Sequence, residues 1–303
     1  MWKGSLALTL ALFLFYSADA KGGDFNQYIL KAVEYLNKNH AGGGYDISEA
    51  FSHNIDYGGR GTVKATSPKK SMCVAAVSEV IIYATKIYAK ETGDNTVFDK
   101  VPVSAWTKGN ATSLRANIFM FKGTGSRGTG HTLSQYKLGE ELRFRDLKPG
   151  DFINLNRSSG SGHSVVFIGY LRSDLKVTSN FNTDVVGFQY FSAQGKGRAD
   201  AGFGYRNAFF GDFCPKKSPV PRDCKVIRSN NRALLNVGRM WDPPQWKYLD
   251  AIKERRISTR SIFEDQNPEL SRAVIDQLVD DFLKEELSMS PVQANKFDGV
   301  TTD

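Results

Sequence analysis

Residues 162–170 read GHSVVFIGY, and this stretch sets our expectation of the fold. Its run of β-branched and aromatic side chains favours a strand over a helix. Similar β-prone runs lie on either side of it: residues 151–155 follow a Pro-Gly turn, and residues 185–191 come later in the chain. We therefore expect a mostly antiparallel sheet that begins near Leu147.

The part of the chain before this sheet is expected to be helical. The spacing of apolar residues predicts an amphipathic helix over residues 25–37, a long helix over 72–90 capped by Ser71, and a short helix over 114–121. A helical N-terminal half followed by antiparallel strands is typical of the α+β class, in which a helix packs on the sheet.

A glycine-rich stretch at residues 123–130, GTGSRGTG, invites a phosphate-binding interpretation. It lacks the Gly-Lys-Ser/Thr ending of a P-loop and does not clearly follow a strand. We interpret it as a mobile surface loop. No dinucleotide fingerprint occurs elsewhere, and we expect no cofactor.

The first twenty residues have the layout of a secretory signal peptide. A short basic start precedes an apolar run over residues 6–16, and Ala18 and Ala20 place small residues at −3 and −1 of a cut after Ala20. The apolar run is too short for a stable membrane anchor. We expect a periplasmic or secreted protein whose catalytic domain covers residues 21–241.

Residues 242–303 are predicted to form a C-terminal extension, because a Pro-Pro pair follows Trp241. The pair Asn267-Pro268 is expected to cap a helix that runs to about Leu287 with an apolar stripe. Ten acidic and three basic side chains lie in residues 263–303, whereas the whole chain has a net charge of +8. We expect this acidic helix to pack back on the basic body; the alternative is a partner-binding or autoinhibitory role.

The overall composition narrows the functional classes. With 41% hydrophobic and 24% charged residues in 303, the chain is neither a disordered tail nor a collagen-like or coiled-coil protein. The charge of +8 would suit an acidic partner, but 32 carboxylates are mixed with the basic residues, which indicates solubility. We predict no nucleic-acid partner.

Three cysteines, Cys73, Cys214 and Cys224, divide into a pair and a single thiol. Cys214 and Cys224 lie in one turn-rich stretch and are expected to form a disulfide in an oxidising compartment. The alternative, a zinc site, lacks a second Cys or His pair at ligand spacing. Cys73 then remains as a candidate reactive thiol.

Cys73 opens the predicted helix 72–90, where the unpaired N–H groups of a helix start stabilise a thiolate. The alternative is a buried structural cysteine. Among the histidines, His163 opens a strand after Gly160-Ser-Gly and is the expected partner of the thiol. The others are expected to be surface loop residues, too scattered for a metal site: His40, His53 and His131.

A third polar group is needed to orient the imidazole. Ser192 and Gln194 share one face of the predicted strand 185–191 and its continuation. Spacing does not choose between them. We favour Gln194, because its longer amide reaches further and accepts from a ring N–H, with Ser192 lining the pocket.

These motifs, in this order, resemble the NlpC/P60 and CHAP group of papain-like cysteine hydrolases. The resemblance covers about residues 45–205: a Cys at a helix start, Pro-Gly-Asp before a strand, and Gly-His opening the next. The Tyr that precedes the nucleophile in that group matches Tyr57, which is followed by two glycines. The common Asp-Cys-Ser of the group reads Met-Cys-Val around Cys73 here.

The resemblance implies a papain-like fold and hydrolysis of amide bonds without a metal. Cys73 would attack the carbonyl and His163 would protonate the leaving amine, while the Tyr57 hydroxyl and the Cys73 N–H would stabilise the oxyanion. The usual substrate of the group is the peptide part of bacterial peptidoglycan. The alternatives are an exported protease or amidase toxin that acts on protein, a transglutaminase-like acyl transferase, and a non-catalytic wall-binding protein.

Overall fold

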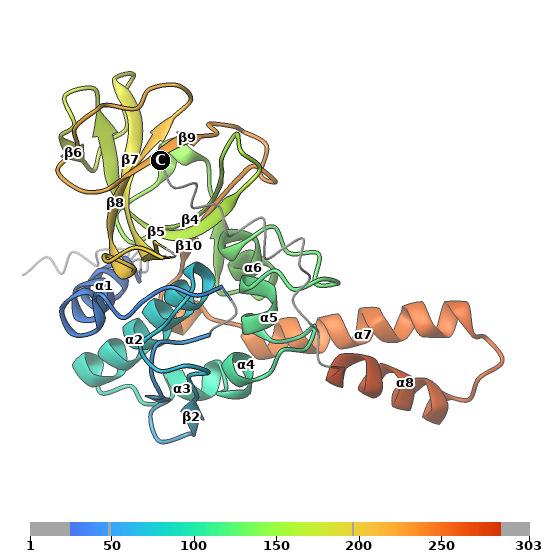
Figure 1. Cartoon of the computed structure of the whole chain (residues 1–303). Coiled ribbons are helices and arrows are strands. Elements are labelled where there is room, and N and C mark those ends of the chain that lie inside the picture. Colours follow the sequence, from blue (N-terminus) through green and yellow to red (C-terminus); the bar gives the residue numbers. More distant parts are fainter. Residues whose placement is uncertain (1–24, 48–49, 196, 286–303) are drawn as a thin grey trace, which may run out of the picture.

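The computed structural model describes residues 25–47, 50–195 and 197–285, so the predicted signal peptide lies outside the described residues. The fold is α+β, with helices packed against a mostly antiparallel sheet (Figure 1). The helices are α1 Asn26–His40, α2 Cys73–Thr92, α3 Val97–Lys100, α4 Ser104–Thr107, α5 Leu114–Ile118, α6 Thr129–Gln135, α7 Tyr248–Gln266 and α8 Arg272–Lys284.

The main sheet has eight strands, seven of them in the order β3-β10-β4-β5-β7-β8-β9, with β6 paired to β5. Every pairing in it is antiparallel except that of β8 with β9. The strands are β3 Gly139–Glu141, β4 Phe152–Asn156, β5 Gly162–Arg172, β6 Val177–Thr178, β7 Val185–Gln194, β8 Gly202–Phe210, β9 Arg222–Val226 and β10 Leu235–Met240. Strands β1 Ile55–Asp56 and β2 Thr62–Val63 form a separate pair.

The strand alternation of β5 divides the core into two parts. Val166 belongs to the large apolar cluster shared with the helices, whereas Val165 and Phe167 belong to a second cluster on the other face of the sheet. The sheet curls over this second cluster, and the helices lie on the opposite face of the sheet (Figure 1). Both faces of β5 are therefore buried, as its continuous apolar run requires.

Helix α2 is the central helix, and it packs against α1 and against strands β5 and β7. Every residue from Cys73 to Thr85 is buried, which explains why this segment is apolar nearly all round. The predicted cap is wrong: the N-cap residue is Met72, and the Ser71 hydroxyl donates instead to the buried carboxylate of Glu79 at 2.9 Å.

The glycine-rich stretch 123–130 is not simply a surface loop, because its last residues begin α6. A Cβ on Gly130 would lie 2.7 Å from the Val237 backbone, so glycine lets α6 approach β10 closely. The Thr129 N–H donates to Asn154 Oδ1 at 2.7 Å. These contacts tie the segment to the sheet.

The C-terminal segment differs from expectation in three respects. The core continues past residue 241, since Trp246, Tyr248 and Ala251 are buried in the large cluster. The basic segment that follows is a helix, α7, which was not predicted. Helix α8 begins after Ser271, whose hydroxyl accepts from the Val274 N–H, and not at Asn267-Pro268.

Helix α8 packs on α7 and not on the body of the protein. Together the two helices form an arm that extends away from the sheet (Figure 1). Buried apolar residues join them, and Arg260 pairs with Asp276 at 3.1 Å. The acidic helix thus pairs with the basic helix beside it in sequence.

Candidate functional site

Cys73 is the first residue of α2 and lies against the start of β5. Its thiol is hydrogen-bonded by the backbone N–H of Ser164, the residue after His163, and by the Tyr45 hydroxyl. The side chain is fully buried, with 0% exposure. The helix start therefore brings the thiol to the expected strand, but into a covered position.

Burial governs the ionisation of this thiol. It raises the pKa of Cys73 above its ordinary value, and the hydrogen bonds from Ser164 and Tyr45 offset this only in part. We expected the helix start to favour the thiolate. In this closed arrangement the neutral thiol is the favoured form.

His163 lies near the start of β5, and Gln194, at the end of β7, is its partner. The His163 Nε2 and Gln194 Oε1 atoms are 3.1 Å apart, and both side chains are buried. With Nε2–H donating to the amide oxygen, Nδ1 carries the lone pair that a general base needs. Burial lowers the pKa of His163 to about 3, so the ring is neutral near pH 7.

Beyond Gln194 a buried polar network continues to β9. The Tyr190 hydroxyl lies 2.8 Å from both Gln194 Oε1 and Asp223 Oδ2 and shares its one proton between them. Asp223 in turn accepts two bonds from Arg157, at 2.6 Å from Nε and 2.7 Å from Nη2. The Arg157 cation holds the pKa of Asp223 below its ordinary value despite burial.

Arg157 acts electrostatically on both candidate reacting groups, lowering the pKa of Cys73 and of His163. Between these two described side chains, however, no hydrogen bond is formed. Strand alternation places His163 on the face of Val165, while Cys73 approaches from the helices. Chemistry between them requires the thiol and the imidazole to move closer.

The other residues expected in the site take different places. The Tyr57 hydroxyl donates to the Val101 carbonyl at 2.8 Å, and its ring packs on Phe98, so the structure does not bring it to the thiol. Ser192 is near the site, but its hydroxyl donates to the Ser164 carbonyl at 2.7 Å and not to the imidazole. Tyr45 holds the position beside Cys73 that was expected for Tyr57.

Two of the other three histidines lie in helices and not in surface loops as expected. His131 is buried within α6 and accepts from the Arg127 N–H at 3.2 Å. His40 ends α1, and its ring stacks on His53 with the ring centres 3.8 Å apart. Among the described residues no three His, Cys, Asp or Glu side chains are placed to hold a metal ion.

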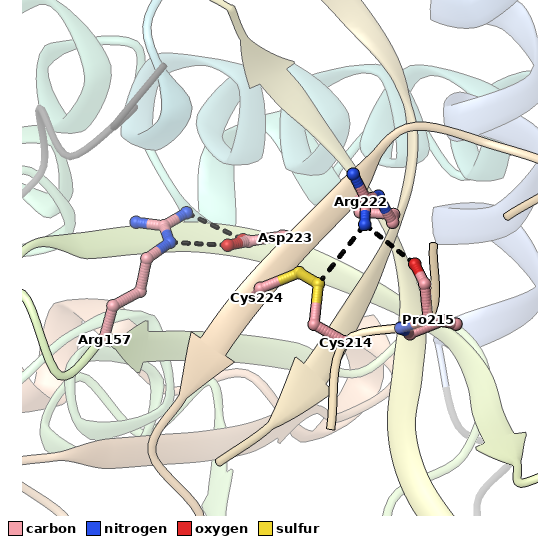
Figure 2. Close-up of a disulfide and its surroundings, with 6 residues drawn as sticks. All are labelled: Arg157, Cys214, Pro215, Arg222, Asp223 and Cys224. Carbon is pink, nitrogen blue, oxygen red and sulfur yellow. Dashed lines mark hydrogen bonds and ion pairs between the residues drawn. A yellow bond between two sulfur atoms is a disulfide. The ribbon is translucent and has the colours of Figure 1, made fainter. Parts of the chain in front are cut away.

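A cavity of about 990 Å³ opens beside His163, Gln194 and Tyr190. One wall is the loop closed by the disulfide between Cys214 and Cys224, which confirms the predicted pairing (Figure 2). Asp223 directly precedes Cys224 in the chain and pairs with Arg157 (Figure 2). Both residues of this pair line the cavity.

Sequence reasoning missed Tyr45, Arg157, Tyr190 and Asp223. The one local signal was the position of Asp223, directly before a cysteine of the predicted disulfide. In the described part of the chain, no helix combines the length and apolar character needed to cross a bilayer. No protein-family model, curated protein or solved structure matches this chain.

Proposed function

We propose that this chain is an exported cysteine hydrolase of the NlpC/P60 and CHAP type, with a papain-like fold, that cleaves amide bonds in the peptide part of peptidoglycan. The observation that carries the proposal is the place of the three predicted residues around the start of β5. The Cys73 thiol lies against Ser164, the strand residue next to His163, and His163 Nε2 lies 3.1 Å from Gln194 Oε1.

In the proposed reaction, His163 Nδ1 takes the thiol proton as the sulfur attacks the amide carbonyl. The imidazolium then gives this proton to the leaving amine, and a thioester with Cys73 remains. His163 next activates a water molecule, which hydrolyses the thioester. Gln194 holds the Nε2–H throughout and so keeps Nδ1 directed at the reacting atoms.

The Tyr45 hydroxyl is a better candidate than Tyr57 for a group near the developing oxyanion, because it already donates to the thiol. The N–H groups at the start of α2 supply further donors. Both stand beside the sulfur that would bond to the carbonyl carbon.

A second candidate is a binding protein without turnover. The complete burial of Cys73 and its raised pKa favour it, since a structural cysteine has these same properties. Turnover requires the thiol to be uncovered, whereas binding does not.

Two measurements on the full chain separate these functions. Purified peptidoglycan is incubated with the wild-type protein and with Cys73→Ser, and released fragments are identified by mass spectrometry. In parallel, Cys73 alkylation is followed in the native protein. Release of peptide fragments that is lost in Cys73→Ser, and lost in proportion to alkylation, supports the hydrolase. Alkylation only after unfolding, with no release by the wild type, refutes it.

A further inference from the structure

The cavity beside His163 has a strongly cationic lining. Seven of its twenty lining residues are Arg or Lys, and two are acidic. One of the two, Asp223, is already neutralised by its bidentate pair with Arg157. A partly enclosed cavity with such a lining concentrates positive potential and attracts an anion.

The Arg206 side chain, which lines the cavity, is a buried cation that shares its ion-pair partner. The Arg206 side chain on β8 is 7% exposed, and its ion pair with Asp200 spans 3.6 Å. Asp200 is 44% exposed and makes a closer bond of 2.8 Å to Arg198. The Arg206 guanidinium therefore has N–H groups left that can donate to a ligand in the cavity.

Next to it, the Gln194 side-chain amide has an unused donor. Its oxygen accepts from His163 and Tyr190, whereas its buried Nε2 has no hydrogen-bond partner. A buried donor without a partner carries a desolvation cost. An acceptor bound in the cavity would remove this cost.

The outer wall is the disulfide-closed loop, which carries Lys216 and Lys217. Both are exposed, and neither has an ion-pair partner among the described residues. Arg222 donates to the Pro215 carbonyl at 2.8 Å and so braces the loop (Figure 2). The two lysines are thus presented on a constrained wall.

We propose that this cavity binds an acidic peptide, with one carboxylate held by Arg206 and the Gln194 amide and a second carboxylate near Lys216 and Lys217. The inference rests on the proposed amide hydrolase, because the cavity reaches His163, the group that serves the scissile bond. Carboxylates suit a planar guanidinium and an amide donor. The volume suits a ligand of a few residues.

The test measures binding and not turnover. A fluorescein-labelled hexaglutamate peptide and a matched hexaglutamine peptide are titrated into full-chain Cys73→Ser with its disulfide intact. We expect the acidic peptide to bind at least about tenfold more tightly than the neutral one. The variant Lys216→Glu/Lys217→Glu in the same background should lose about tenfold in affinity for hexaglutamate.

The matched control is Lys64→Glu/Lys108→Glu, which changes the net charge equally at two exposed lysines outside the cavity. We expect it to bind hexaglutamate within about twofold of the parent. An equal loss in the control, or equal binding of both peptides, overturns the proposal. So does tighter binding of a single-stranded oligonucleotide that depends on the same two lysines.

The outcome also separates this inference from the function on which it rests. Lysine-dependent binding of hexaglutamate without any peptidoglycan release by the wild type retains the acidic-peptide site and rejects the hydrolase. Peptidoglycan release with no preference for the acidic peptide retains the hydrolase and rejects the site.

Discussion

Replacing Asp223 with alanine should be among the most destabilising single changes in this protein. Asp223 accepts from Arg157 at 2.6 and 2.7 Å and lies 2.8 Å from the Tyr190 hydroxyl, and its side chain is 7% exposed. The substitution leaves a guanidinium buried without its counter-charge. Breaking such a pair costs about 3–5 kcal/mol, and the Tyr190 hydroxyl adds roughly 1 kcal/mol.

Chemical denaturation followed by fluorescence measures this cost, and the thermal midpoint should fall by about 10–20 °C. Asp174→Ala is the matched control, because Asp174 is 38% exposed and its pairs with Arg172 and Lys176 both span 3.7 Å. We expect the control to change the free energy of unfolding by less than about 0.5 kcal/mol.

A double variant tests the reason for the loss. Arg157→Met/Asp223→Leu removes both charges together, so no buried charge is left unpaired. We expect it to be more stable than Asp223→Ala by at least about 2 kcal/mol. A cost below about 1 kcal/mol for Asp223→Ala, or a double variant as unstable as the single, would refute this account of the pair.

Three further outcomes follow from the same structure. Burial raises the pKa of the Glu79 carboxyl from its ordinary value of 4.5 to about 7. Its contribution to stability is therefore present below pH 4.5 and is lost as the pH rises through 7. In denaturation curves, the free energy of unfolding of Glu79→Gln should gain on the order of 3 kcal/mol relative to wild type between pH 4.5 and 8. Gln194→Ala should lower the kcat of peptide release about 10²-fold and Ser192→Ala less, because Gln194 is hydrogen-bonded to the imidazole and Ser192 is not. The reverse ranking in steady-state assays would reassign the role. Cys214→Ser/Cys224→Ser should lower the free energy of unfolding by about 3 kcal/mol, and an unchanged denaturation midpoint would contradict this.

The elements that sequence reasoning predicted are those with a strong local pattern. The β-branched run of β5 and the long apolar run of α2 each define their own structure. Helix α7 lacks such a pattern, since most of its residues are polar or charged and only Tyr248 and Ala251 are buried. Its contacts with Tyr136 of the body and with α8 are made by side chains whose spacing in α7 shows no apolar stripe.

In the candidate site, too, the predicted residues are those with a local sequence pattern. His163 was identified because it opens a β-prone run after glycines, and Gln194 because it shares a face with Ser192 in the next predicted strand and has the longer side chain. Asp223 lies 66 residues from Arg157 and reaches the network through the parallel pairing of β9 with β8, which no local pattern indicates. Tyr45 and Tyr57 each adjoin glycines, so the motif alone could not tell which hydroxyl meets the thiol.

In this closed arrangement, the burial that covers Cys73 also shifts the pKa values of Cys73 and His163. Burial is the largest cause of the raised pKa of Cys73 and of the lowered pKa of His163, and both shifts favour uncharged groups. A movement that admits substrate and water would weaken both effects together, because hydration stabilises a thiolate and an imidazolium alike. The Arg157 cation would then favour the thiolate but oppose the imidazolium, which Asp223 favours. Under the proposed function, uncovering Cys73 therefore favours its thiolate at the moment when a substrate can enter.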